Sequence, residues 1–134
     1  MKKIIVLIGL VGLITGCAEK EEYENSVLEQ MKIDRDISDY KISPENMTEC
    51  VVETSSKKMP GLVAIDPTRK MAYKNYTKML KLNQSQDPKK TLEELRVDFG
   101  SAKELAAAHA NYSESIVECM SGLVTSSEET VNKK

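Results

Sequence analysis

The 134-residue sequence has little aromatic character: it contains no tryptophan, one phenylalanine (Phe99) and one histidine (His109). Its core must therefore come from aliphatic residues, methionine, alanine and five tyrosines. This is a thin apolar supply, and a small domain built from it would gain from a covalent cross-link. The longest apolar or glycine run, from Ile4 to Ile14, has 11 residues, whereas a membrane-spanning helix needs roughly 20.

Motifs of catalysis and metal binding are also missing. The sequence has no Gly-x-Ser-x-Gly nucleophile elbow, no His-Glu-x-x-His zinc motif, no calcium loop and no Cys-x-x-Cys pair. His109 falls among apolar residues at helical spacing, where a histidine is usually a packed residue of the core. We therefore expect no catalytic residue, no metal ligand and no cofactor, and we expect the protein not to be an enzyme.

The clearest positive signal lies at the N-terminus. Lys2 and Lys3 precede the apolar run, which ends on the tetrapeptide ITGC at residues 14–17. A basic start, a short apolar middle and small residues before a cut site are typical of a secretory signal. The tetrapeptide resembles the lipobox of bacterial lipoproteins. The resemblance implies that residues 1–16 are a signal peptide and that Cys17, as the new first residue, carries a diacylglyceryl group on its sulfur and an acyl chain on its amine.

A lipidated Cys17 would fix the protein to a membrane. One acyl chain gives only reversible binding, whereas several chains on one residue should hold a small domain firmly. The next residue is Ala18. In Gram-negative lipoproteins an aspartate there favours the inner membrane, so the resemblance favours the outer membrane, with the protein facing the periplasm. A cleaved signal without lipidation and an uncleaved anchor are the alternatives.

The charge balance argues against nucleic acid as a partner. Two of the 19 basic residues lie in the signal, so the remaining 118 residues carry 17 basic and 21 acidic side chains, a net charge of −4. Proteins that bind nucleic acid through bulk charge carry an excess of basic residues. We therefore expect no nucleic-acid partner.

Two cysteines remain after Cys17, namely Cys50 and Cys119. Export would place them in an oxidising compartment, where such a pair usually forms a disulfide. The bond would close a loop of roughly 70 residues and contribute about 4 kcal/mol on the loop-entropy model. We expect it to be a structural cross-link.

Helix starts are marked repeatedly along the chain. A serine or aspartate stands directly before a proline at residues 43–44, 66–67 and 87–88; the first can cap free amides and the second suits the first helical position. Ser101 with Glu104 fits a capping box. Apolar residues follow each start at helical spacing. We expect helices to begin near Pro44, Pro67, Pro88 and Ser101.

The last of these helices has the clearest pattern. Its apolar seam, with near-heptad spacing, consists of Leu105, His109, Tyr112, Ile116, Cys119 and Leu123. Alanines between residues 106 and 110 would allow a neighbour to pack closely on several sides. The helix after Pro44 places Cys50 on its inward face, so both cysteines should reach a shared core.

The other segments complete an all-α domain, a bundle of four to five helices. Residues 23–31 have apolar side chains every four positions and predict a short helix, and 33–42 reads as its end and a loop. Residues 61–65 (GLVAI) lack a strand partner and are interpreted as a buried connector. The expected organisation is a signal peptide (1–16), a lipidated cysteine and tether (17–22), a helical domain (23–125) and a polar tail (126–134).

Three functional classes remain open. We favour a non-enzymatic protein-interaction module, anchored by Cys17, with a protein partner in the cell envelope. The alternative is a carrier or sensor that holds a small apolar ligand or copper between helices, because Met71, Met79, Met120, His109 and the thiols are soft ligands; methionine also simply fills cores that are poor in aromatics. An enzyme would need a cleft that gathers His109 with carboxylates.

Overall fold

The computed structural model describes the backbone of residues 18–131 and the side chains up to residue 127. The elements are α1 (Ala18–Ile33), α2 (Arg35–Asp39), α3 (Pro44–Lys57), α4 (Pro67–Leu80), the 3-10 turn η1 (Leu82–Gln84), α5 (Pro88–Asp98) and α6 (Ala102–Val131). Residues 18–131 contain no strand, which confirms the all-α prediction. The predicted signal peptide (1–16) and the predicted lipidation site Cys17 lie outside the described residues.

The four helix starts lie where the sequence places them, and their caps form. The Ser43 hydroxyl accepts the backbone N–H of Asn46 at 3.3 Å. Asp66 and Asp87 cap α4 and α5 in the same way, each before a proline. The Ser101 hydroxyl accepts the N–H of Glu104 at 3.1 Å. Local capping chemistry therefore fixes these starts independently of tertiary packing.

One further helix lies in the segment that the sequence suggests is a helix end and a loop. Asp34 leaves helical geometry and its carboxylate accepts the N–H groups of Asp36 and Ile37, at 2.9 and 3.4 Å. This N-cap ends α1 and starts α2 one residue later. The bundle therefore has six α-helices within the described residues, α2 being only five residues long.

Both ends of the helical domain extend beyond the expected boundaries. Residues 18–22, expected as a tether, belong to α1, where Lys20 and Glu24 form an i,i+4 ion pair at 3.0 Å. At the other end α6 continues into the segment expected as a polar tail. The hydroxyls of Thr125 and Ser126 donate to carbonyl groups one turn earlier, at 2.9 and 2.8 Å, so these polar side chains are accommodated within the helix.

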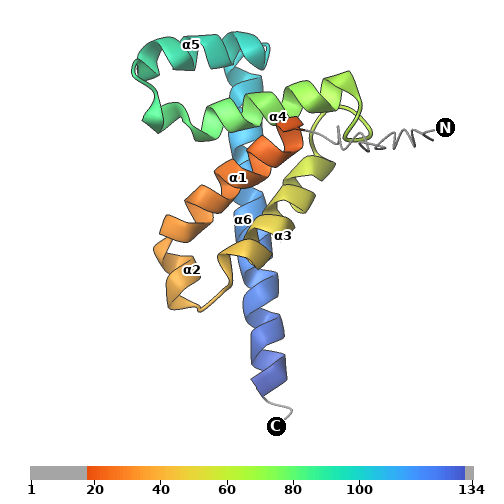
Figure 1. The fold of residues 1–134 in the computed structure, drawn as a ribbon, viewed down its shortest axis with the longest axis vertical. Helices are drawn as coiled ribbons and strands as arrows, with labels where there is room; N and C mark the ends of the chain where they lie inside the picture. The colour runs from red at the N-terminus through yellow and green to blue at the C-terminus, as the bar shows by residue number, and fades with distance from the viewer. Residues whose placement is uncertain (1–17, 132–134) are drawn as a thin grey trace, which may run out of the picture.

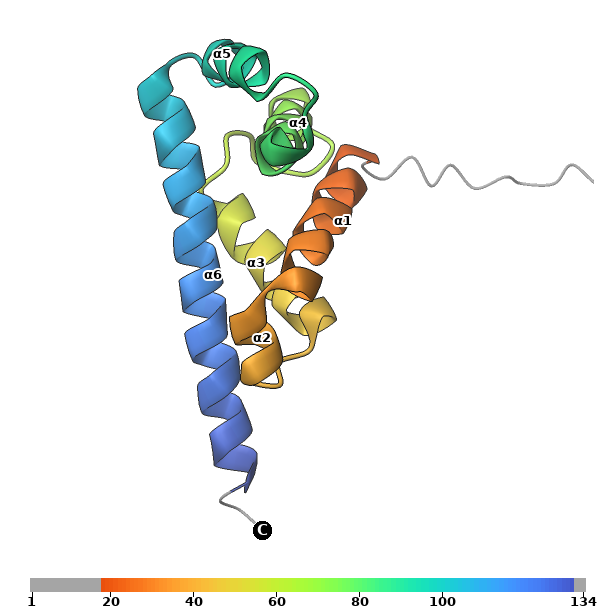
Figure 2. The same cartoon turned by 90° about the vertical axis from the view of Figure 1, so that its left-hand side faces the viewer.

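The long helix α6 (Ala102–Val131) runs along most of the length of the described structure. Figure 1 shows it running almost the full length, with α4 and α5 crossing its upper end, and Figure 2 shows α3 packed along it with α1 on the far side of α3. The main helix contacts are α1 with α3, α1 with α4, and α3 with α6. The start of α1 lies near α4, whereas the C-terminal turns of α6 project beyond the other helices at the opposite end.

Tyrosines occupy the centre of the core, in a chain that has no tryptophan and only one phenylalanine. Tyr23 is fully buried, and its ring meets Tyr76 edge-on with the ring centroids 5.7 Å apart. Tyr73, Tyr76 and Tyr112 are also buried. Aromatic pairs of this geometry stabilise a core beyond the area they bury.

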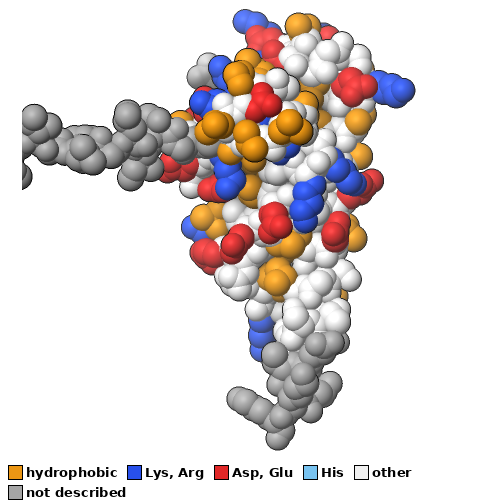
Figure 3. All heavy atoms as spheres, turned by 90° about the vertical axis from the view of Figure 1, so that its right-hand side faces the viewer, with side chains coloured by type: hydrophobic (Ala, Val, Ile, Leu, Met, Phe, Trp, Pro, Cys, Tyr) orange, Lys and Arg blue, Asp and Glu red, His pale blue; other side chains and the backbone are white. Residues whose placement is uncertain are grey.

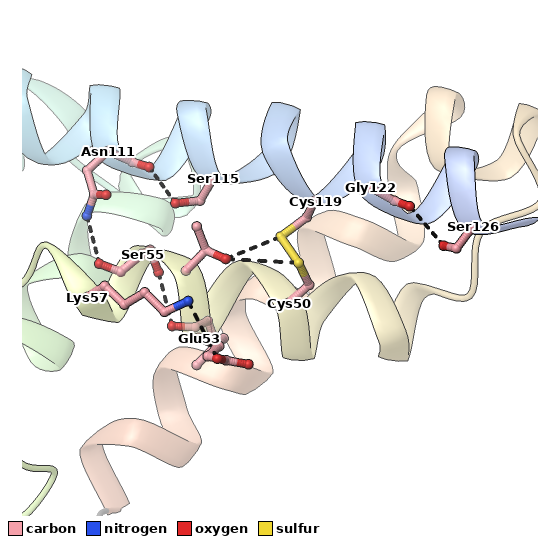
Figure 4. Close-up of a disulfide and its surroundings, with 11 residues drawn as sticks. Cys50, Glu53, Ser55, Lys57, Asn111, Ser115, Cys119, Gly122 and Ser126 are labelled. Carbon is pink, nitrogen blue, oxygen red and sulfur yellow. Dashed lines mark hydrogen bonds and ion pairs between the residues drawn. A yellow bond between two sulfur atoms is a disulfide. The ribbon is translucent and has the colours of Figure 1, made fainter.

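The expected disulfide is present. Cys50 of α3 and Cys119 of α6 are bonded, with their Cα atoms 5.8 Å apart, and Figure 4 shows the bond bridging the two helices. The Thr54 hydroxyl lies 3.6 Å from the Cys119 sulfur. The bond closes a sequence separation of 69 residues, so it ties the first half of the chain to the last helix.

Candidate functional site

The sequence-predicted seam of α6 is only partly the buried face. Tyr112 and Cys119 are buried, but His109 is exposed. The buried face is centred on residues 108, 111, 112, 115 and 119. His109 directly follows Ala108, and successive side chains of a helix point about 100° apart, so His109 points away from this face. The expectation that His109 is a core residue is therefore wrong. Within the described residues, no carboxylate forms an ion pair with it.

The opposite side of α6 is uncharged and faces solvent. We call this side the outward face of α6; it consists of Ala106, Ala110, Ser113, Val117, Ser121 and Val124. These residues follow one another at spacings of four, three, four, four and three. Ser113 and Val124 are half-buried, the other four are exposed, and Val117 is 69% exposed. Charged residues make up 30% of the chain, yet none stands in this row over five turns of helix. Of the alanines expected to allow close packing, Ala108 is buried in the core, whereas Ala106 and Ala110 lie on this exposed face.

A buried polar cluster fixes α6 against α3 and α4. The Asn111 side-chain amide donates both to the Ser55 carbonyl and to the Tyr76 hydroxyl, at 2.9 Å each, and Figure 4 shows Asn111 reaching across to Ser55. Since a carbonyl can only accept, these bonds determine which end of the amide faces α3. Within the part of the chain that the structure describes, the Asn111 Oδ1 atom is buried and has no hydrogen-bond partner.

Asn111 also lines a hollow between α4, α5 and α6 with a volume of about 430 Å3. Apolar walls are provided by Met71, Tyr76 and Phe99, and Lys58 stands among the charged residues that line the same hollow. Small-molecule sites commonly have this character, largely apolar with a few convergent polar groups. The hollow matches the kind of cavity that the carrier hypothesis requires.

A larger hollow, of about 720 Å3, lies along α1 and α3. Tyr73 and Val52 line it together with Lys20 and several glutamates, among them Glu24 and Glu53. Among residues 18–127, however, no three His, Cys, Asp or Glu side chains are grouped closely enough to hold a metal ion. The walls of this hollow are therefore acidic, but their carboxylates are not grouped closely enough to form a metal site.

The soft ligands that suggested copper do not converge. Cys50 and Cys119 are joined in the disulfide, so neither provides a thiolate. Met79 is buried in the core, whereas Met71 is exposed. His109 and Met120 are 11 residues apart on one straight helix, which separates them by roughly 16 Å. Met79 and Met120 instead contribute to packing, as the aromatic-poor composition suggests.

The perturbed titrating groups of the core are tyrosines. Burial raises the pKa of Tyr23, and burial also raises the pKa of Tyr112 to about 12. Tyr23 donates to or accepts from the Ser55 hydroxyl at 2.9 Å, whereas the Tyr112 hydroxyl has no hydrogen-bond partner among the described residues. Both shifts have desolvation as their main cause, and both phenols belong to the helix packing.

The α3–α4 loop carries a feature that sequence reasoning missed. Residues 61–65 form a connector as expected, but they are not buried: Leu62 is 91% exposed, Val63 57% and Ile65 69%. Figure 3 shows hydrophobic side chains gathered on the upper part of the face that includes this loop. A short apolar run between helices suggests burial, and only the tertiary structure reveals that nothing within the described residues covers it.

The described helices include none that is both long and apolar enough to cross a membrane. No protein-family model, no curated protein and no solved structure matches the chain.

Proposed function

We propose that the protein is a lipid-anchored envelope protein that acts as a non-enzymatic interaction module, and that the outward face of α6 is where a helix of its protein partner docks. The single observation that supports this most strongly is the uncharged row of Ala106, Ala110, Ser113, Val117, Ser121 and Val124 on an exposed helix. On an ordinary surface helix, charged residues would occupy that side.

The row has the spacing at which one helix packs along another. Steps of three and four residues keep side chains on one stripe of an α-helix. Alanine and serine allow a second backbone to approach closely, and Val117 and Val124 provide apolar area. A partner helix that covers this stripe would desolvate no charged group of the stripe itself, and such desolvation is what makes charged faces costly to bury. An amphipathic partner helix fits best.

The proposed lipid anchor gives this face an orientation. Cys17 directly precedes α1, and the projecting end of α6 lies at the other end of the molecule from the start of α1 (Figure 1). With its N-terminus held at the periplasmic surface of the outer membrane, the protein would extend α6 into the periplasm. The face would then be accessible to a partner in that compartment.

Site-specific photo-crosslinking tests the docking face. A photoreactive amino acid is placed at Val117, or at Val97 of α5 as a matched control that is also a strongly exposed valine. After illumination of intact cells, we expect a discrete protein adduct from position 117 and none from position 97. The adduct is identified after detergent solubilisation, and the mass of the purified protein reports whether Cys17 is lipidated.

Two results would count against the proposal. Equal adduct patterns at the two positions would show that the α6 face is not selected by a partner. A purified protein with an unmodified Cys17, or with residues 1–16 still attached, would remove the proposed anchor.

The hollow between α4, α5 and α6 supports a second candidate, a carrier of a small apolar ligand. Its volume of about 430 Å3 and its walls of Met71, Tyr76 and Phe99 suit a small, largely apolar ligand. Native mass spectrometry of protein released gently from envelopes tests it. A bound small molecule that is absent from an Ala107→Phe variant, which would narrow the hollow from an exposed position of α6, would favour this candidate over the interaction module.

A further inference from the structure

We propose that the α3–α4 loop inserts Leu62, Val63 and Ile65 into the surface of the membrane that carries the Cys17 anchor. The inference rests on the proposed lipidation of Cys17, and it assigns a lipid-facing surface to a module whose partner-facing surface lies on α6. Loop, anchor and α6 then divide the molecule into a membrane side and a periplasmic side.

The loop is held in a defined shape by its own polar contacts. The Asp66 carboxylate accepts the backbone N–H of Leu62 at 3.2 Å, and the Asp66 N–H donates to the Val63 carbonyl at 2.9 Å. The buried Arg69 guanidinium donates to the carbonyls of Ser56 and Gly61. Several backbone groups of the loop are therefore satisfied within the protein, as contact with an apolar medium requires. Meanwhile the three aliphatic side chains remain 57 to 91% exposed.

Gly61 makes this shape possible. Its φ of +87° lies in the left-handed region, and a Cβ there would come within 2.6 Å of the Arg69 backbone nitrogen. A glycine is thus required for the chain to turn against α4 and present the following residues outward.

The loop lies beside the end of the chain that the lipid would hold. Lys20 and Glu24 of α1 line the same hollow as Ala64 of the loop, and Figures 1 and 2 both place the α3–α4 connection next to the start of α1. Lys20 is only three residues from Cys17, a span of at most roughly 11 Å. An anchor on Cys17 therefore keeps the loop within reach of the bilayer surface at all times.

The chemistry of the surface favours acyl chains over lipid charge. The lysines before the loop are engaged, Lys57 with Glu53 at 3.6 Å and Lys58 with Glu114 at 2.8 Å. The first turn of α1 carries two glutamates, at residues 19 and 21. Electrostatic attraction to anionic headgroups is thus weak, and insertion of the aliphatic side chains contributes more to membrane binding. The anchor supplies a high effective concentration, so three side chains suffice where they would not hold a free protein.

The absence of tryptophan in the chain makes a direct test possible. The full lipidated protein is prepared with Leu62→Trp, or with Val117→Trp on the outward face of α6 as a control at a position with 69% exposure. Each is reconstituted in vesicles of zwitterionic phosphatidylcholine, with and without bromine on the acyl chains. We expect the Leu62→Trp protein to emit at shorter wavelength and to lose most of its fluorescence in brominated vesicles. The Val117→Trp protein should stay quenchable only by acrylamide in the water phase.

Mass spectrometry of the same samples separates two kinds of failure. An unlipidated protein would refute the anchor and, with it, this inference. A lipidated Leu62→Trp protein that is quenched by acrylamide and not by brominated lipid would overturn the inference alone, and would leave the loop as a surface for a protein partner. Both positions are exposed, so neither substitution disturbs the core, and equal disulfide content of the two variants verifies the fold.

Discussion

At the scale of single residues, two buried phenols differ in one respect that decides their energetic role. Tyr23 and Tyr112 are both packed into the core, but of the two only Tyr23 has a hydrogen-bond partner within residues 18–127, the Ser55 hydroxyl at 2.9 Å. A buried hydroxyl without a partner loses its bonds to water and gains nothing in return. The same chemical group therefore stabilises the fold at one site and costs stability at the other.

Removing each hydroxyl should move stability in opposite directions. Tyr23→Phe should lower the free energy of unfolding by about 1 to 2 kcal/mol, because it breaks the bond and leaves Ser55 without that partner. Tyr112→Phe should leave it unchanged or raise it by up to about 1 kcal/mol. Urea unfolding at pH 7 followed by circular dichroism measures both. A Tyr112→Phe protein less stable than Tyr23→Phe would contradict this account.

These phenols also make stability depend on alkaline pH. A free tyrosine has a pKa of 10.0, whereas burial raises the pKa of Tyr112 to about 12. Above pH 10 the unfolded chain loses this proton while the folded protein keeps it, so the free energy of unfolding should fall as pH rises from 10 towards 12. One such group contributes a slope of about 1.4 kcal/mol per pH unit. Urea unfolding between pH 9 and 11 measures the slope, and Tyr112→Phe should make it shallower.

At the scale of elements, the ends of the helices depend on local chemistry and their faces on the whole structure. The Ser43-Pro44, Asp66-Pro67 and Asp87-Pro88 starts are readable in the sequence because a cap needs only neighbouring residues. The buried face of α6 depends on where α3 and α4 lie, and this is why His109 could not be placed correctly from periodicity alone.

Two glycines offer a matched test of this distinction. Gly61→Ala should destabilise the protein by about 1 to 3 kcal/mol, because its φ of +87° strains any L side chain and the new Cβ would meet Arg69. Gly122→Ala, in the middle of α6 with nothing within 4 Å of the new Cβ, should instead stabilise by up to about 1 kcal/mol. Thermal unfolding compares the two variants with the parent. Equal effects of the two substitutions would show that the loop conformation is not what Gly61 provides.

At the scale of the whole molecule, the Cys50–Cys119 bond supports a small core. On the loop-entropy model a closed segment of 69 residues contributes about 4 kcal/mol. Reduction, or a Cys50→Ala, Cys119→Ala double variant, should lower the free energy of unfolding by about that amount, as measured by urea unfolding with and without reductant. The double variant should be insensitive to the reductant, and a stability loss below about 1 kcal/mol would show that the packing of α3 on α6 suffices without the bond.

The sequence was informative wherever the determining physics was local. Helix class, the helix starts at Pro44, Pro67 and Pro88, and the cysteine pairing followed from caps, spacing and the count of thiols. Exposure was not local: Leu62 looks like a core residue until its neighbours are known, and the partnerless Oδ1 atom of Asn111 is invisible without coordinates. The outward face of α6 and the α3–α4 loop were missed for the same reason. Each is recognised as a surface only because no other described residue covers it.

The disulfide also divides the chain mechanically. The covalent ring runs from Cys50 to Cys119, so α4, α5 and most of α6 lie inside it, whereas α1 and α2 lie outside. Tension applied at Ala18 is therefore resisted by noncovalent contacts of α1, chiefly the packing of Tyr23 and Val27 and the hydrogen bond between the Tyr23 and Ser55 hydroxyls. Under load α1 would separate first and lengthen the connection to the anchor, while the covalent ring, which contains the outward face of α6 only as far as Val117, stayed closed.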